Sequence, residues 1–190
     1  MKTLDIFPNI TLFANLKSTM GHHIDAIIGR KAETNIDVIK KYQLAAAFEK
    51  EYTIIILFDD SMYHWSHILG CGIESESENL NWASPIVFQI AEEIGFEKYA
   101  IIQTNYFGGM GDQLASLYEH GTCLLKETEI NHVLKELGVV TTGRNDEFDE
   151  LNLGEYRAAE YYYWDENNFA DERPNMIAGK VPEDYKYKFR

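Results

Sequence analysis

Residues 98–127 read KYAIIQTNYFGGMGDQLASLYEHGTCLLKE and contain three strand-like runs separated by two turn signals. A glycine-rich loop separates YAIIQTN from QLASLYE, and His120 with Gly121 separates that second run from TCLLKE. Glycine tolerates the backbone angles that tight turns require. Short apolar runs joined by such turns are typical of antiparallel hairpins. We therefore predict three consecutive antiparallel strands in this stretch.

The loop between the first two runs contains Gly108, Gly109 and Gly111. A phosphate-binding loop joins a strand to a helix and usually ends in a lysine followed by a hydroxyl residue. Here Asp112 follows the last glycine, and the next run is typical of a strand. The sequence therefore favours a structural loop, in which Gly109 and Gly111 adopt positive backbone angles.

A helix is predicted on each side of the three strands. In SPIVFQIAEEIGF, Ser84 can cap the first turn, Pro85 suits the first helical position and Gly95 suits the end. In TEINHVLKELG, Thr128 is the expected cap and Gly138 the expected end. Helices flanking consecutive antiparallel strands are typical of the α+β class.

Upstream, residues 42–49 and 52–58 are apolar runs separated by a charged turn, which predicts a further hairpin. A chain of 190 residues suits one domain. We expect an α+β core domain over residues 1–140 with a largely antiparallel sheet and two main helices. Residues 141–190, which are acidic and aromatic with little periodicity, are expected to pack on this core as an extension.

The charge of the chain limits the choice of partner. Seventeen lysines and arginines stand against 31 acids, which gives a formal net charge of −14. Such a surface repels nucleic acid and anionic membranes, and it speeds the approach of a basic protein. Solubility alone is the alternative explanation of the charge. The apolar runs are far shorter than the roughly 20 residues of a membrane span.

Acids and aromatic rings coincide between residues 146 and 172, with a second acidic patch, ESESEN, at residues 74–79. Large rings supply contact energy at interfaces, and acids select a basic partner; the alternative is that the rings fill the core. The sequence favours a non-enzymatic protein that covers a basic partner, such as a toxin or nuclease, as inhibitors and immunity proteins do. The predicted contact residues are Asp146, Glu147, Asp149, Glu150, Tyr162, Trp164, Asp165, Glu166, Asp171 and Glu172.

A metal-dependent hydrolase is the alternative function, since histidines and aspartates are common metal ligands. The spacing matches no zinc motif, so we expect no metal and no other cofactor in the first interpretation. The residues that could serve the alternative are His22, His23, Asp25, Asp59, Asp60, His64 and His67.

Two cysteines, Cys71 and Cys123, are far apart and lack metal-site spacing. Two buried free thiols are therefore expected, together with a reducing compartment. The N-terminus lacks the pattern of a signal peptide. These features predict a cytoplasmic protein of the acidic, bacterial type.

Overall fold

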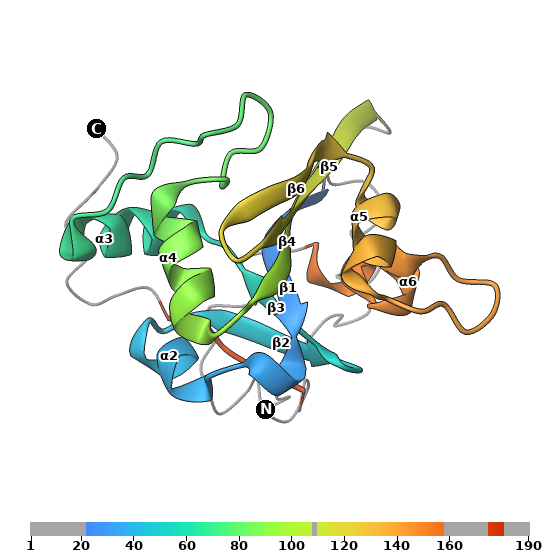
Figure 1. Ribbon diagram of the computed structural model, residues 1–190, viewed down its shortest axis with the longest axis horizontal. Coiled ribbons are helices and arrows are strands. Elements are labelled where there is room, and N and C mark those ends of the chain that lie inside the picture. Colours follow the sequence, from blue (N-terminus) through green and yellow to red (C-terminus); the bar gives the residue numbers. More distant parts are fainter. Residues whose placement is uncertain (1–21, 108–109, 158–174, 181–190) are drawn as a thin grey trace, which may run out of the picture.

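The computed structural model describes residues 22–107, 110–157 and 175–180 (Figure 1). These residues form one seven-stranded sheet with helices on both of its faces. The strands are β1 (His22–Arg30), β2 (Ala45–Glu49), β3 (Tyr52–Ile56), β4 (Lys98–Phe107), β5 (Met110–Glu119), β6 (Thr122–Thr128) and β7 (Met176–Ile177). The helices are α2 (Ile36–Lys41), α3 (Asp59–Leu69), α4 (Pro85–Ile94), α5 (Ile130–Leu137) and α6 (Glu147–Glu150), with short 3-10 turns η1 (Lys31–Glu33) and η2 (Leu153–Tyr156).

The sheet is antiparallel throughout, with the strand order β6-β5-β4-β1-β3-β2-β7. The strand β1 lies at its centre, where Ile27 is paired with Ile55 of β3 and with Ile101 of β4. The predicted α+β class with an antiparallel sheet is therefore confirmed.

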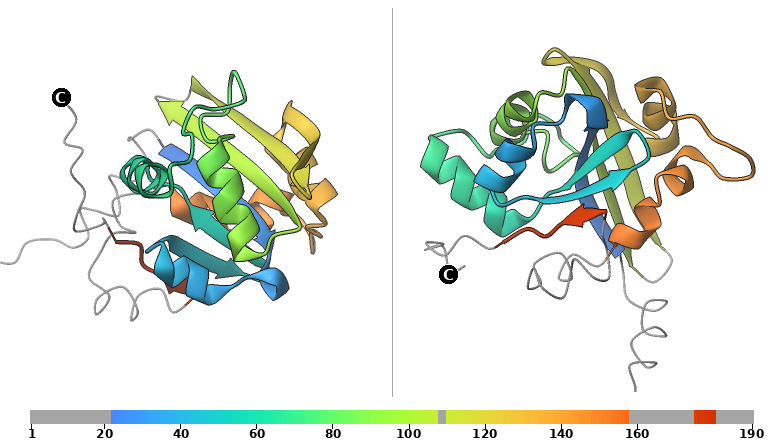
Figure 2. Two further views of the ribbon diagram at one scale, coloured as in Figure 1. Left: turned by 60° about the vertical axis from the view of Figure 1, so that its left-hand side comes forward. Right: turned by 90° about the horizontal axis from the view of Figure 1, so that it is seen from below.

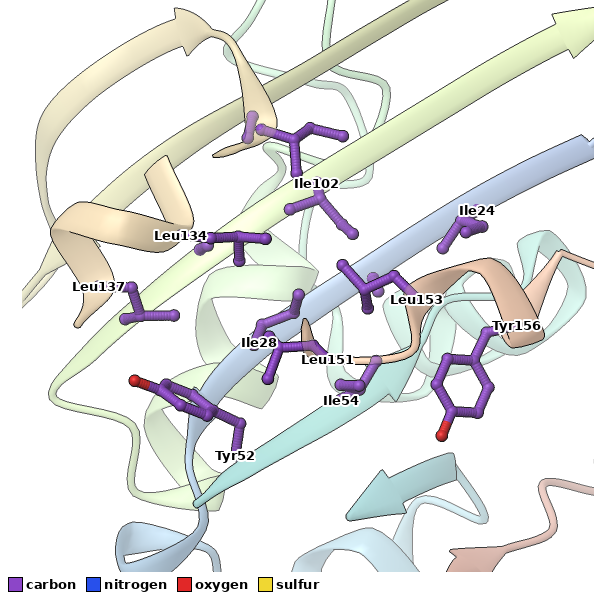
Figure 3. Close-up of a cluster of buried hydrophobic side chains, with 14 of the residues drawn as sticks. Ile24, Ile28, Tyr52, Ile54, Ile102, Leu134, Leu137, Leu151, Leu153 and Tyr156 are labelled. Carbon is purple, nitrogen blue, oxygen red and sulfur yellow. The ribbon is translucent and has the colours of Figure 1, made fainter. Parts of the chain in front are cut away.

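Alternation along β1 divides the core into two parts, because successive side chains in a strand point to opposite faces. Ile24 and Ile28 lie on the face covered by α5, α6 and η2, which we call the α5 face. Ile27 lies on the other face, covered by α2, α3 and α4, which we call the α4 face. Figure 2 shows the sheet between these two groups of helices. Figure 3 shows the core of the α5 face.

Both predicted hairpins are confirmed. The strands β2 and β3 pair from Ala45–Ile56 to Glu49–Tyr52, and β4, β5 and β6 form the predicted three-stranded meander. In the turn between β5 and β6, His120 has φ 48° and Gly121 has φ 75°. Two successive residues with positive φ give the turn the twist that tight hairpins favour.

The two predicted helices are also present, but their caps differ from the prediction. Helix α4 starts at Pro85 and stops at Gly95, which has φ 99°; the Ser84 side chain, however, makes no capping hydrogen bond. Helix α5 has Glu129 rather than Thr128 at its cap.

The prediction missed α3 because its apolar residues form no clear stripe. Ser61 and Met62 are the residues of this helix that are buried, while most of its other side chains are partly or fully exposed.

Gly111 is structural for a different reason from the one predicted. It does not adopt a positive φ, unlike the glycines at helix ends and turns. A side chain at this position would instead collide with the backbone oxygen of Asn105 and the backbone of Tyr106, on the paired strand β4. Close approach of the two strands therefore requires glycine here. Gly108 and Gly109 lie outside the described residues.

Candidate acidic pocket

A polar pocket of about 430 Å³ opens on the α4 face, beside the N-terminal half of β1. This size falls in the range of about 300–1,000 Å³ that small-ligand pockets occupy. Three segments build it: β1, the first turns of α3, and residues 70–84, which we call the covering loop. Its lining residues are His23 and Asp25 from β1, Asp59 and Tyr63 from α3, and Ile73, Ser75, Asn81 and Trp82 from the covering loop.

Asp25 is the buried centre of this site. Because His23 and Asp25 are two residues apart on one strand, both lie on the same face. Asp25 is 3% exposed, and its Oδ2 lies 2.6 Å from His23 Nε2 and accepts a 3.0 Å hydrogen bond from Trp82 Nε1. Its second oxygen, Oδ1, is buried without a hydrogen-bond partner among the described residues. Half of this carboxylate is therefore held in place, and the other half lacks a donor.

The three titratable groups of β1 and α3 affect one another. The hydrogen bond with Asp25 raises the pKa of His23 above its usual 6.5, and the charges of Asp25 and Asp59 add to this against the opposing effect of burial. Burial raises the pKa of Asp59; the charge of Asp25 raises it further, and His23 opposes the rise. The pocket thus favours positive charge, whether on a histidine or on a ligand.

The covering loop presents acids outward from a fixed backbone. In the run ESESE, Glu74, Glu76 and Glu78 are exposed, whereas Ser75 and Ser77 are partly buried. Ser75 Oγ donates to the backbone oxygen of Leu80, and Ser77 Oγ accepts from the amide of Leu80 at 2.9 Å. Alternate residues of the run therefore have different roles: the serines attach the loop to the protein, and the carboxylates face the solvent.

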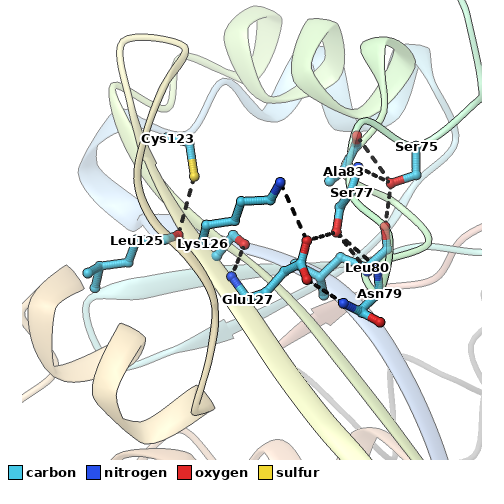
Figure 4. A network of polar contacts seen from close by, with 10 residues as sticks. Ser75, Ser77, Asn79, Leu80, Ala83, Cys123, Leu125, Lys126 and Glu127 are labelled. Atoms are coloured by element: carbon cyan, nitrogen blue, oxygen red, sulfur yellow. Dashed lines mark hydrogen bonds and ion pairs between the residues drawn. The ribbon is translucent and has the colours of Figure 1, made fainter.

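Glu127 of β6 fastens this loop to the sheet (Figure 4). Its carboxylate accepts hydrogen bonds from Ser77 Oγ at 2.7 Å and from Asn79 Nδ2 at 2.5 Å. The backbone of Glu127 has φ 49°, and its amide donates to Ser116 Oγ at an irregularity in the β5–β6 pairing. This uncommon conformation sets the side chain beside the covering loop.

Glu127→Ala is expected to loosen the covering loop without unfolding the protein. The variant removes both acceptors for Ser77 and Asn79, so the buried Leu80 amide, which depends on Ser77, should exchange with solvent several-fold faster. Native-state hydrogen exchange measures this. Glu129→Ala, which removes an exposed acid nearby, is the matched control and should leave that amide unchanged. Equal exchange rates in the two variants would show that Glu127 does not hold the loop.

Part of the metal set predicted from sequence converges at the pocket. His23, Asp25 and Asp59 line it, whereas Asp60, His64 and His67 lie elsewhere on α3. The side chain of His22 lies outside the described residues. Within the described part of the chain, no group of three histidine, cysteine or acidic side chains is arranged to hold a metal ion.

The described part of the predicted contact segment, residues 146–157, lies on the α5 face, on the other side of the sheet from the pocket. Asp146 caps α6 by accepting from the Asp149 amide at 2.9 Å, and Glu147 follows it in the helix. Glu150 is 3% exposed and binds Lys50 and Thr142, so its carboxylate is already engaged within the chain. The remaining predicted contacts lie outside the described residues: Tyr162, Trp164, Asp165, Glu166, Asp171 and Glu172.

Sequence analysis missed Tyr63, Asn81, Trp82 and Glu127 as site residues. The period-two pattern of ESESE was a usable signal for a segment with one side held and one side free. Trp82 lies between Asn81 and Ala83 in a segment without periodicity, so nothing in its local sequence shows that its indole contacts Asp25. The cysteines are both free, as predicted, but neither is fully buried: Cys71 is partly buried and Cys123 is exposed.

Comparisons with protein-family models, with curated proteins and with solved structures found no match. Among the described residues, every helix is too short or too polar to cross a bilayer. The pocket and the exposed acids beside it are therefore the features that bear on function.

Proposed function

We propose that this is a non-enzymatic acidic binding protein, of the inhibitor or immunity-protein type, that covers a basic surface of a partner protein in the cytoplasm. The observation that carries the proposal is the covering loop, which holds Glu74, Glu76 and Glu78 outward next to the pocket of Asp25 and Asp59. Acids fixed in advance lose little conformational freedom on binding. Their arrangement on one surface also speeds encounter with a basic partner.

A basic protein suits this surface better than a nucleic acid does. The net charge of −14 repels a phosphate backbone, and within the described part of the chain no lysine or arginine lines the pocket. Single-stranded nucleic acid needs a basic groove beside its stacking rings. Basic side chains of a protein, in contrast, would meet carboxylates both on the covering loop and in the pocket.

The triple variant Glu74→Gln, Glu76→Gln, Glu78→Gln is expected to lose a salt-sensitive partner. Tagged wild-type protein should capture at least one basic protein from a cell extract at low salt and release it as salt rises, because exposed charges are screened beyond about 8 Å at physiological ionic strength. Mass spectrometry identifies the captured protein. Purified partner then gives association and dissociation rates, of which association should slow most in the variant.

The matched control carries Glu51→Gln, Glu92→Gln and Glu136→Gln, which remove the same charge from exposed positions elsewhere. It should bind the partner almost as wild type does, and both variants should melt at similar temperatures. Equal loss of binding in both variants would show that binding depends on the net charge of the protein and not on the covering loop. If the affinity for the partner changes neither with salt nor in either variant, the covering loop is not the contact.

A metal-dependent hydrolase is the second candidate, because His23, Asp25 and Asp59 line one pocket, although among the described residues their side chains do not form a preformed metal site. Elemental analysis of the purified protein separates the two functions. Stoichiometric zinc, manganese or iron in the wild-type protein, and its loss in the Asp25→Asn variant, would favour the hydrolase. Metal-free protein that binds its partner would favour the binding protein.

A further inference from the structure

We propose that the pocket between β1, α3 and the covering loop binds a guanidinium group. The source of that group rests on the proposed function, in which it is an arginine side chain of the basic partner. A free compound that carries the same group is the other source. The proposal depends on the unpartnered oxygen of Asp25, on the charges of the lining residues and on the two aromatic rings.

The hydrogen bonding of the Asp25 carboxylate is incomplete among the described residues. Its Oδ2 has two contacts, with His23 and Trp82, but Oδ1 is buried with no donor among the described residues. A buried charged oxygen without a donor is unfavourable, so groups of this kind are normally paired. A ligand with several N–H groups that reached this end of the carboxylate would supply the missing donor.

The charge of the lining residues favours a cation. Among the described residues, the charged groups that line the pocket are Asp25, Asp59 and His23, and Tyr63 is the further titratable one. Two carboxylates against one imidazole leave a net charge of −1 when His23 is protonated and −2 when it is neutral. An anionic ligand would meet repulsion in either state, whereas a cation would be attracted.

The two aromatic rings of the pocket favour a guanidinium over an ammonium group. Tyr63 and Trp82 both line the pocket, with ring centroids 6.3 Å apart in an edge-to-face arrangement. A guanidinium stacks on aromatic rings, is weakly hydrated and carries five donors in one plane. The side chains of Asp59 and Asn81 provide acceptors in addition to Asp25. An ammonium group has three donors and holds its water more strongly, so arginine should bind better than lysine.

The direct test uses capped amino acids. N-acetyl-L-arginine methylamide, its lysine analogue and its citrulline analogue are titrated into the protein, and the indole N–H signal of Trp82 is followed by NMR, with Trp82→Phe assigning it among three tryptophans. We expect the arginine compound to shift the signal at millimolar concentration. The lysine compound should bind several-fold more weakly, and the uncharged citrulline compound should not bind. No shift with arginine, or equal shifts with all three, would overturn the proposal.

Variants locate the binding. Asp59→Asn should weaken binding of the arginine compound about tenfold, the usual effect of losing a charged hydrogen-bond partner. Asp60→Asn is the matched control, since its neighbouring carboxylate does not line the pocket, and should change affinity less than about twofold. Asp25→Asn should abolish binding. If this substitution of a buried residue prevents folding, the Asp59→Asn variant still tests the site. Equal affinity in Asp59→Asn and Asp60→Asn would exclude the pocket.

Acidity provides an independent readout. Protonation of His23 and Asp59 lowers the negative charge of the pocket, and the pKa of each is raised. Affinity for the arginine compound should therefore increase as pH rises through these pKa values. Affinity that decreased with rising pH would contradict cation binding at this site.

Two comparisons separate the sources and the two proposals. Capped arginine binding better than free arginine supports a peptide source, and the reverse supports a small molecule; both keep the guanidinium site. If a captured partner is lost in the covering-loop triple variant but binds Asp59→Asn normally, the guanidinium inference fails while the proposed function stands. If capped arginine binds but no salt-sensitive partner exists, the proposed function fails and the site takes a free compound.

Discussion

Replacing Leu153 with alanine is expected to lower the free energy of unfolding by about 2–5 kcal/mol. Leu153 is 0% exposed and belongs to the core of the α5 face. Figure 3 shows it with Leu151 among Ile24, Ile28 and Ile54 of the sheet. Truncation to alanine leaves a cavity that the surrounding strands can fill only in part. Urea denaturation followed by circular dichroism measures the loss.

Leu124→Ala is the control for this experiment. It removes the same atoms from a side chain on β6 that is 47% exposed, and the free energy of unfolding should change by no more than about 0.5 kcal/mol. If Leu153→Ala were as stable as Leu124→Ala, the Leu153 side chain would not stabilise the core. A large loss would mean that a chain cut after residue 140 lacks part of its hydrophobic core.

Local pattern was enough to predict the strands around the two hairpins and the positions of α4 and α5. Each of these depends on residues that are close in sequence, such as His120 and Gly121 in one turn or Gly95 at one helix end. Helix α3 was missed because its burial arises from contacts with the covering loop and α4 rather than from a regular apolar stripe. Propensity and periodicity do not carry that information.

The site was predictable only in part, and the reason is pairing register. The amide of Leu57, just after β3, donates to the Asp25 backbone oxygen at 2.8 Å, which places Asp59 beside His23 and Asp25. Residue type alone identifies His23, Asp25 and Asp59 as candidate metal ligands. Residue type alone does not separate them from Asp60, His64 and His67, because that separation depends on which side of α3 faces the pocket.

Contacts between residues far apart in sequence also determine the position of the covering loop. Glu127 and Ser77 are 50 residues apart in sequence and meet through an irregularity in the β5–β6 pairing. Trp82 and Asp25 are 57 residues apart. From its sequence, ESESEN was identified only as an acidic patch. In the structure, hydrogen bonds of Ser75 and Ser77 hold its backbone in place.

Replacing Trp82 with alanine is expected to lower the free energy of unfolding by about 3–5 kcal/mol, because a large side chain that is 6% exposed leaves the core of the α4 face. Trp82→Phe keeps most of the ring and removes the N–H that binds Asp25. This variant should cost about 1.5–3 kcal/mol, the usual value of a hydrogen bond to a charged group. Denaturant unfolding of both variants separates ring packing from the hydrogen bond.

A double-mutant cycle of Trp82→Phe with Asp25→Asn tests whether the two residues depend on each other. If the indole supports the buried carboxylate, the combined loss should differ from the sum of the single losses by about 0.5–3 kcal/mol. Losses that add within about 0.5 kcal/mol would show that Asp25 gains nothing from Trp82. The covering loop would then be held over the pocket by ring packing and by Glu127, and among the described residues His23 would be the remaining side-chain partner that stabilises the Asp25 carboxylate.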